Sequence, residues 1–240
     1  MRITPADILY YSYCPYLLHK DTGKTKLLGD LDLFNKCLFE SIIDTERKCL
    51  LTDSDVTPRK LLRSWDTIWW PAAVENEIPL KVVEEECVRA SKFMSDYCNY
   101  EISGFMYPTV GVKITTQREI ENCTLHSSVD MIKVDLNNRE KNAVIIDFAT
   151  RELSEREIAI DMYNIAKSYS FYSNKGETIT YVHIKPKRDR FFISSAIFRP
   201  SQMKEIDKVI KHLAYGIYNN IRYMNRWNCK ECGACKTFKF

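Results

Sequence analysis

Apolar residues recur at spacings of three and four through most of the first hundred positions of the chain. That period is typical of amphipathic helices, because residues three and four apart lie on the same helix face. Three segments carry the pattern, namely 28–51, 57–74 and 77–100. The sequence therefore predicts a helical part over residues 27–99.

After Gly104 the helical spacing gives way to strands, some of them alternating and some apolar throughout. Such short segments, separated by polar turns, predict a run of β-strands. The last two strands flank a polar loop, 185–190, and are expected to form a hairpin. The predicted strands are 106–120, 124–137, 141–150, 177–184 and 190–198.

Two more helices are expected in this second part of the chain. One covers 154–174, where Ser154 and Glu157 are spaced as a capping box. The other is a long helix over 201–225. No internal repeat or low-complexity linker separates these elements, so we expect one α/β domain, 1–240, with a sheet core over 104–200 flanked by helices.

The composition is that of a cytosolic globular protein. With 240 residues and 45% hydrophobic content, the chain can bury one large core. The net charge of +3 is only mildly basic and does not by itself indicate nucleic acid. No apolar run approaches the roughly 20 residues of a membrane span, and the start does not resemble a secretory signal. The nine cysteines are therefore expected to be reduced thiols in a cytoplasm rather than disulfides.

Three of these cysteines lie within seven residues near the end of the chain, at Cys229, Cys232 and Cys235. A C-x2-C-x2-C loop can wrap three corners of a [4Fe-4S] cluster while a distant thiolate takes the fourth. Cys14 is the predicted fourth ligand, because Pro15 follows it at the end of a short helix that begins with Thr4 as N-cap. Zinc is the alternative metal, and an unmetallated thiol tail is a further alternative.

Such a cluster would close the C-terminus onto the N-terminus. We expect it to be structural rather than redox-active, because metal binding across the two ends contributes directly to folding. The remaining cysteines fall within apolar helix or strand patterns and are expected in the core, as small buried side chains. They are Cys37, Cys49, Cys87, Cys98 and Cys123.

Two acidic residues occur in successive predicted strands, Asp130 within one and Asp147 at the end of the next. Adjacent strands could bring both carboxylates to one edge of the sheet. Two hard oxygen ligands there would hold Mg²⁺ or Mn²⁺, which can polarise a phosphodiester and orient a water. The alternative is that both residues are strand-end acids that cap turns.

The order of these features resembles the iron-sulfur RecB-like nucleases, which include CRISPR-associated exonucleases and the AddB nuclease domain. The resemblance comes from "YYSYCP" near the start, an acid-bearing pair of strands, Tyr163 in the following helix and the terminal cysteines, and it covers nearly the whole chain. It implies a PD-(D/E)xK fold, a central mixed sheet flanked by helices. It also implies a metal site on DNA strands or ends, with Asp130 as the first acid and Asp147 as the second.

The chain departs from the family pattern at two signature positions. Ala149 stands where the motif lysine is expected, and Ala159 stands where the Gln of the Gln-x-x-x-Tyr helix is expected. Alanine can neither position a water nor stabilise developing negative charge. Lys133, in the strand of Asp130, and Lys167, one turn beyond Tyr163, are candidates for a migrated lysine.

Three functions are compatible with these observations. The favoured hypothesis is a DNA-binding or assembly subunit that retains the family's fold but has a degraded site. The second is an active Mg²⁺- or Mn²⁺-dependent exonuclease with a rearranged site. The third is a cluster-stabilised interaction module whose aromatic stretch "SWDTIWWP" docks a protein partner.

DNA contacts are expected at two groups of cations, because clustered Lys and Arg neutralise phosphates without reading sequence. An ordinary polar turn and a solvated tail are the alternative interpretation. Among the four histidines, only His126 could approach the metal, since it lies four residues before Asp130 on the same strand face. The two groups are Lys185, Lys187, Arg188 and Arg190, and Arg222, Arg226, Lys230 and Lys236.

Overall fold

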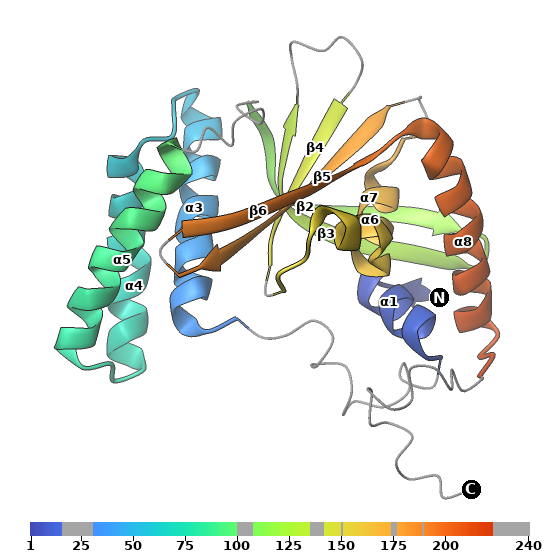
Figure 1. The fold of residues 1–240 in the computed structure, drawn as a ribbon, viewed down its shortest axis with the longest axis horizontal. Helices are drawn as coiled ribbons and strands as arrows, with labels where there is room; N and C mark the ends of the chain where they lie inside the picture. Colours follow the sequence, from blue (N-terminus) through green and yellow to red (C-terminus); the bar gives the residue numbers. More distant parts are fainter. Residues whose placement is uncertain are drawn as a thin grey trace, which may run out of the picture.

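The computed structural model describes residues 1–15, 31–99, 108–134, 142–149, 151–173, 177–188 and 190–222. It is an α/β structure in which a mixed sheet lies between two groups of helices (Figure 1). The terminal cysteines Cys229, Cys232 and Cys235 lie outside the described residues, as do Arg226, Lys230 and Lys236. None of the described helices has the length and apolar content needed to cross a lipid bilayer.

The predicted helical part forms three helices on one side of the sheet (Figure 1): α3 (Leu33–Thr52), α4 (Pro58–Glu75) and α5 (Leu80–Asn99). Asp32 and Thr57 cap α3 and α4, because their side chains accept backbone N–H groups three residues on. Apolar stripes on these helices meet one face of the sheet in a single core cluster. The helical part predicted from the spacing of apolar residues is therefore confirmed as a layer of three helices.

The aromatic stretch in α4 belongs mainly to this core. Trp65 and Trp69 are each 1% exposed, and their rings stack with centroids 5.0 Å apart. Phe34 packs edge-on against both rings. Only Trp70 reaches the surface, with 42% of its area exposed. Two of the three tryptophans that the interaction hypothesis would use are thus unable to contact a partner.

The sheet has six strands in the described part of the chain. Its order is β1-β3-β4-β5-β6, and β2 pairs with β3 off this path. The β4–β5 and β1–β3 pairs are parallel, and the others are antiparallel. The strands are β1 (Arg2–Ile3), β2 (Thr109–Ile120), β3 (Cys123–Val134), β4 (Asn142–Phe148), β5 (Thr178–Lys187) and β6 (Arg190–Phe198).

The second group of helices covers the other side of the sheet (Figure 1). Short α1 begins at Pro5 behind a capping box of Thr4 and Asp7, so the predicted N-cap is confirmed. Its Tyr11 hydroxyl donates to the carbonyl of Ile221 at 2.9 Å, which ties it to the chain just after the last helix. The helices are α1 (Pro5–Tyr13), α6 (Glu155–Ile160), α7 (Met162–Phe171) and α8 (Pro200–Tyr218).

The predicted helix 154–174 is in fact two helices. Asp161 leaves the helical region, with φ −72° and ψ 117°, and ends α6. Its carboxylate accepts the N–H groups of Tyr163 and Asn164 and so starts α7. Arg151 holds the same carboxylate at 2.8 and 3.1 Å. Periodicity alone could not show this break, because the apolar spacing continues across it.

Two other predicted boundaries were wrong. The polar loop expected at 185–190 is mostly strand, since β5 continues through Lys187 and β6 begins at Arg190. The turn therefore lies at Arg188, whose φ of 56° is left-handed. The last helix, predicted to reach residue 225, ends at Tyr218, and Asn220 two residues on has a left-handed φ of 53°.

Candidate functional site

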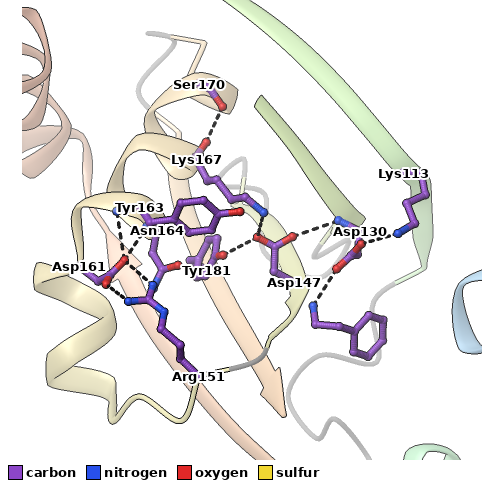
Figure 2. Close-up of polar contacts among 11 residues, drawn as sticks. Lys113, Asp130, Asp147, Arg151, Asp161, Tyr163, Asn164, Lys167, Ser170 and Tyr181 are labelled. Carbon is purple, nitrogen blue, oxygen red and sulfur yellow. Dashed lines mark hydrogen bonds and ion pairs between the residues drawn. The ribbon is translucent and has the colours of Figure 1, made fainter. Parts of the chain in front are cut away.

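The two acids predicted to meet do lie side by side, on the neighbouring strands β3 and β4 (Figure 2). The backbone N–H of Asp130 donates to Asp147 Oδ1 at 3.1 Å. In return, the N–H of Phe148 donates to Asp130 Oδ2 at 2.8 Å. Paired residues of the two strands run from Val134↔Ala143 to Met131↔Ile146. At the next position the side-chain carboxylates, instead of backbone carbonyls, accept the N–H groups of the opposite strand. Each acid is therefore held by the neighbouring strand.

Lys167 reaches this acid pair from α7 (Figure 2). Its Nζ lies 2.6 Å from Asp147 Oδ2, and the Tyr181 hydroxyl of β5 donates to the same oxygen. Burial on its own lowers the pKa of Lys167, but the charge and hydrogen bond of Asp147, together with nearby Tyr163 and Asp130, raise it above its usual value. Lys167 therefore stays protonated and acts as a fixed cation rather than a base.

Lys113 of β2 approaches the pair from the opposite side (Figure 2). Its Nζ lies 2.9 Å from Asp130 Oδ1 and 3.3 Å from Glu40 Oε1. Lys113 has a left-handed φ of 49°, an uncommon conformation for a residue with a side chain. Burial lowers its pKa, whereas the charges of Asp130 and Glu40 raise it by more. Each acid thus has one lysine partner.

The close approach of two carboxylates has an electrostatic cost. Burial and the neighbouring Asp147 charge both raise the pKa of Asp130, and the lysine contact only partly opposes them. The side chains of Asp147 and Asp130 are 4% and 19% exposed, so water screens this repulsion poorly. Like charges held together in this way are typical of sites that bind a cation or do acid–base chemistry.

The break before α7 sets the position of Lys167. The Asp161 cap and its Arg151 partner fix the first turn of α7, from which Tyr163 and Lys167 project one turn apart (Figure 2). Lys167 Nζ lies 4.9 Å from the centre of the Tyr163 ring, a cation–π contact. The Tyr163 ring therefore lies beside the Lys167 ammonium that contacts Asp147.

His183 lies beside Asp147 in the β4–β5 register and is 4% exposed. Burial lowers the pKa of its imidazole to about 4, although the charge of Asp147 opposes that shift. The ring is therefore neutral at physiological pH. It contributes no positive charge to the site.

A pocket of about 470 Å³ opens next to Lys167. His126 lines this pocket together with Lys167, and its predicted approach to a metal stays a prediction. The pocket lies between β1, the start of α1, the β2–β3 pair and α7. Its wall includes Arg2, Thr116, His126, Ser127, Tyr163 and Lys167.

Lys133, the other candidate for the migrated lysine, was wrongly placed at the site. Its Nζ pairs with Glu46 Oε1 at 3.0 Å, in the layer between the sheet and α3. The Tyr97 hydroxyl donates to the same oxygen at 2.5 Å, and the Thr109 hydroxyl donates to Oε2 at 2.7 Å. Side chains alternate along a strand, so Lys133 faces away from Asp130. Its role is to neutralise a buried carboxylate.

The cations predicted to contact DNA are spread over two places. Lys187 pairs with Glu152 and lies 5.4 Å from the Phe192 ring, which leaves less of its charge available to a phosphate. Arg188 and Arg190 are exposed at the hairpin turn. Arg222, past the end of α8, bonds the side-chain oxygen of Asn220 at 2.8 Å. Lys185 is partly buried in β5.

In the described ranges, no three His, Cys, Asp or Glu side chains gather closely enough to hold an ion. The Asp130–Asp147 pair offers two carboxylates at the candidate site, fewer than that arrangement requires. Cys14 is fully buried directly after α1, three residues beyond Tyr11, whose hydroxyl donates to the Ile221 carbonyl. The five cysteines expected in the core have free thiols, with Cys87 and Cys98 only partly buried.

Sequence reasoning missed Lys113, Tyr181 and the Arg151–Asp161 anchor. Lys113 is one strand from Asp130, and only the β2–β3 register brings them together. Tyr181 lies in an apolar strand, where a tyrosine is expected to be an ordinary residue of the hydrophobic core. The capping pattern of Asp161 with Tyr163 and Asn164 was visible in the sequence and could have located the start of α7.

The fold and the site together define an α/β protein with a buried acid pair held between two lysines. No family model matches the chain. No curated protein matches it significantly. Among solved structures it is similar to one described as the crystal structure of SSO0001, with 13% identity and a TM-score of 0.39, over 99% of this chain and 85% of that chain. A similarity of that size does not define a fold family.

Proposed function

We propose that this protein is a metal-dependent deoxyribonuclease of the iron-sulfur RecB-like PD-(D/E)xK type, in which Lys167 of α7 replaces the motif lysine. The observation that carries the proposal is the 2.6 Å contact between Lys167 Nζ and Asp147 Oδ2. A lysine at position 149 would be expected beside this acid, but the chain has Ala149. A cation from the neighbouring helix meets the same electrostatic need.

The residues present fit a hard divalent cation. Asp130 and Asp147 offer carboxylate oxygens that repel each other, which an added cation relieves. Mg²⁺ commonly takes one or two carboxylates and completes its shell with waters and substrate phosphate oxygens. When bound, such an ion supplies Lewis-acid activation of the phosphodiester and a water of lowered pKa.

The chain's own side chains account for the remaining requirements. Lys167 stays charged and can stabilise negative charge that develops on a phosphoryl oxygen. The Phe148 and Asp130 N–H groups orient the two carboxylates, and the Tyr181 hydroxyl fixes Asp147. Oriented, desolvated groups need little reorganisation during reaction. These groups thus provide one fixed positive charge and two oriented carboxylates.

A second candidate is a DNA-binding subunit without cleavage activity. The observation in its favour is that both acids are already satisfied, Asp147 by Lys167 and Tyr181, and Asp130 by Lys113. A carboxylate pair neutralised by lysines could serve only to join strands β3 and β4. In this candidate function, the exposed cations bind DNA phosphates and no metal ion is required at the acid pair.

A cleavage assay distinguishes the two candidates. Anaerobically purified protein is incubated with single- and double-stranded DNA in Mg²⁺, Mn²⁺ or EDTA. The nuclease proposal expects products with Mg²⁺ or Mn²⁺ and none with EDTA. Binding of DNA without products under any metal condition would favour the second candidate.

Moving the lysine back tests its relocation. Lys167→Met is expected to slow cleavage about 100-fold, the effect of losing one preorganised charge-stabilising group. Adding Ala149→Lys to that variant should recover at least about tenfold of the lost rate. Since Lys167→Met also removes one partner of buried Asp147, denaturant unfolding is measured for both variants. Full activity in Lys167→Met would contradict the role given to Lys167.

The iron-sulfur assignment also belongs to this proposal. Cys14 and the end of α8 lie on the same side of the molecule, since Tyr11 of α1 bonds Ile221. Cys229 is eight residues beyond Ile221, within reach for a loop that closes onto Cys14. Zinc remains the alternative, and iron, sulfide and zinc analysis separates the two metals.

Cys14→Ser is expected to remove most of the bound iron and acid-labile sulfide, and with them the visible colour. The unfolding free energy should fall by several kcal/mol, because cluster binding is coupled to folding. Cys37→Ser is the matched control, since Cys37 is buried among apolar helix residues. Equal metal content in both variants would refute Cys14 as a ligand.

A further inference from the structure

The pocket beside Lys167 has a basic and hydroxyl-rich lining. Among its described lining residues there are no acids, whereas Arg2, His126 and Lys167 supply side chains that carry or can take up positive charge. Thr115, Thr116 and the two serines Ser127 and Ser128 also line the pocket. Its volume of about 470 Å³ falls within the roughly 300–1,000 Å³ range of small-ligand pockets.

The first turn of α1 also lines the pocket, and its positive helix end is partly offset by the Asp7 carboxylate, which accepts from Thr4 at 2.8 Å. Thr4, Pro5 and Ala6, where this nine-residue helix begins, line the pocket. The N-terminal end of a helix carries a partial positive charge and unpaired N–H groups. Asp7 and Thr4 satisfy each other's backbone N–H groups, which does not involve Ala6. This helix end alone would not define a site.

Ser127 provides independent evidence for a ligand. It lines the pocket, is 6% exposed, and its buried hydroxyl has no hydrogen-bond partner in the described structure. A buried hydroxyl without a partner costs about 1–3 kcal/mol, so native proteins rarely leave one unused. A phosphate oxygen in the pocket would give this hydroxyl the acceptor that it lacks.

We propose that the pocket binds the terminal phosphate monoester of a DNA strand. The inference rests on the proposed function, because Lys167 both lines the pocket and contacts Asp147. A strand end held there lies next to the acid pair. The enzyme then recognises a phosphorylated end and cuts the adjacent part of that strand.

A monoester fits these groups better than an internal diester. A terminal phosphate carries close to two negative charges and three free acceptor oxygens. An internal phosphate has one charge and two free oxygens. This pocket offers more cations and hydrogen-bond donors than the single charge and two free oxygens of a diester can engage. The surplus favours the more highly charged monoester.

The test is equilibrium binding by fluorescence anisotropy. Short single-stranded oligonucleotides carry a phosphate at the 5′ end only, at the 3′ end only, or at neither end, in EDTA to prevent cleavage. The wild-type protein is expected to bind one phosphorylated form about tenfold more tightly than the hydroxyl form, and inorganic phosphate should remove that difference. The preferred form reveals which strand end enters the pocket.

Two variants connect the preference to the pocket. Ser127→Ala and Arg2→Gln should reduce it to about twofold or less. Ser127→Ala removes an unsatisfied buried hydroxyl, so its unfolding free energy should be unchanged or higher, and misfolding cannot explain the loss. Arg156→Gln, an exposed cation on α6 outside the pocket, should keep the full preference.

Equal affinity for phosphate and hydroxyl ends would overturn the inference, as would a preference that survives both pocket variants. Cleavage is measured separately with Mg²⁺ on the same oligonucleotides. Cleavage without an end preference refutes only the pocket assignment. An end preference without cleavage supports the pocket and refutes the nuclease proposal.

Discussion

Asp130→Asn is expected to abolish metal-dependent cleavage, by about 1,000-fold or more, while leaving the protein at least as stable. A metal ion contributes several kcal/mol of transition-state stabilisation, and each 1.36 kcal/mol is a factor of ten in rate. Asparagine is a poor ligand for a hard cation. Its amide oxygen can still accept the Phe148 N–H that now bonds Asp130.

The expected stability follows from the pKa of Asp130. Burial and the Asp147 charge raise this pKa in the folded protein, so ionised Asp130 opposes folding at neutral pH. A neutral amide removes that repulsion and loses only the half-exposed contact with Lys113. Rate and unfolding free energy are measured on the same preparation, because opposite changes in the two separate a chemical role from a structural one.

Glu40→Gln is the matched control for this experiment. Glu40 contacts the same Lys113 ammonium at 3.3 Å, but it is 55% exposed and does not approach Asp147. Its cleavage rate should stay within about threefold of wild type, since exposed ion pairs contribute little. An Asp130→Asn variant that cleaves DNA normally would remove the basis for a metal at this site.

Glu46→Leu is expected to have the largest effect on stability, a loss of about 3–5 kcal/mol. Glu46 and Lys133 are 4% and 11% exposed, so the substitution leaves a buried ammonium without a counter-charge. The hydroxyls of Tyr97 and Thr109 lose their acceptor as well. Denaturant unfolding measures the change.

The double variant Glu46→Leu/Lys133→Met isolates the charge. It should regain at least half of the lost stability, because an apolar pair of similar volume carries no unpaired charge. Glu205→Gln on α8 is the surface control. Its partner Lys208 and Glu205 itself are both 71% exposed, and the cost should be under about 1 kcal/mol. A similar loss in all three variants would contradict the buried-charge explanation.

The helices and strands were largely predictable because local patterns determine them. Helical spacing located α3, α4 and α5, and the Thr4–Pro5 pair located the start of α1. The turn between β5 and β6 was misplaced because Lys185, Pro186 and Lys187 look like loop residues. These residues extend the hairpin toward α5, where Phe191 packs on Phe93.

Of the candidate site, only the meeting of the two acids could be predicted from the sequence. Asp130 and Asp147 lie in successive strands, so their meeting could be expected from order alone. Choosing Lys167 over Lys133 required the direction of each side chain, which depends on strand alternation and on the break at Asp161. Lys113 could not be found without the register of β2 against β3 and its left-handed backbone.

The exchange of N–H groups between Asp130 and Asp147 has an evolutionary consequence. Each carboxylate finishes the hydrogen bonding of the opposite strand, so both acids contribute to the fold whether or not they bind a metal. A lineage that abandoned catalysis would still be under selection to keep them. Under the proposed nuclease function, the loss of the lysine at position 149 or 167 would therefore mark lost activity better than the loss of either acid.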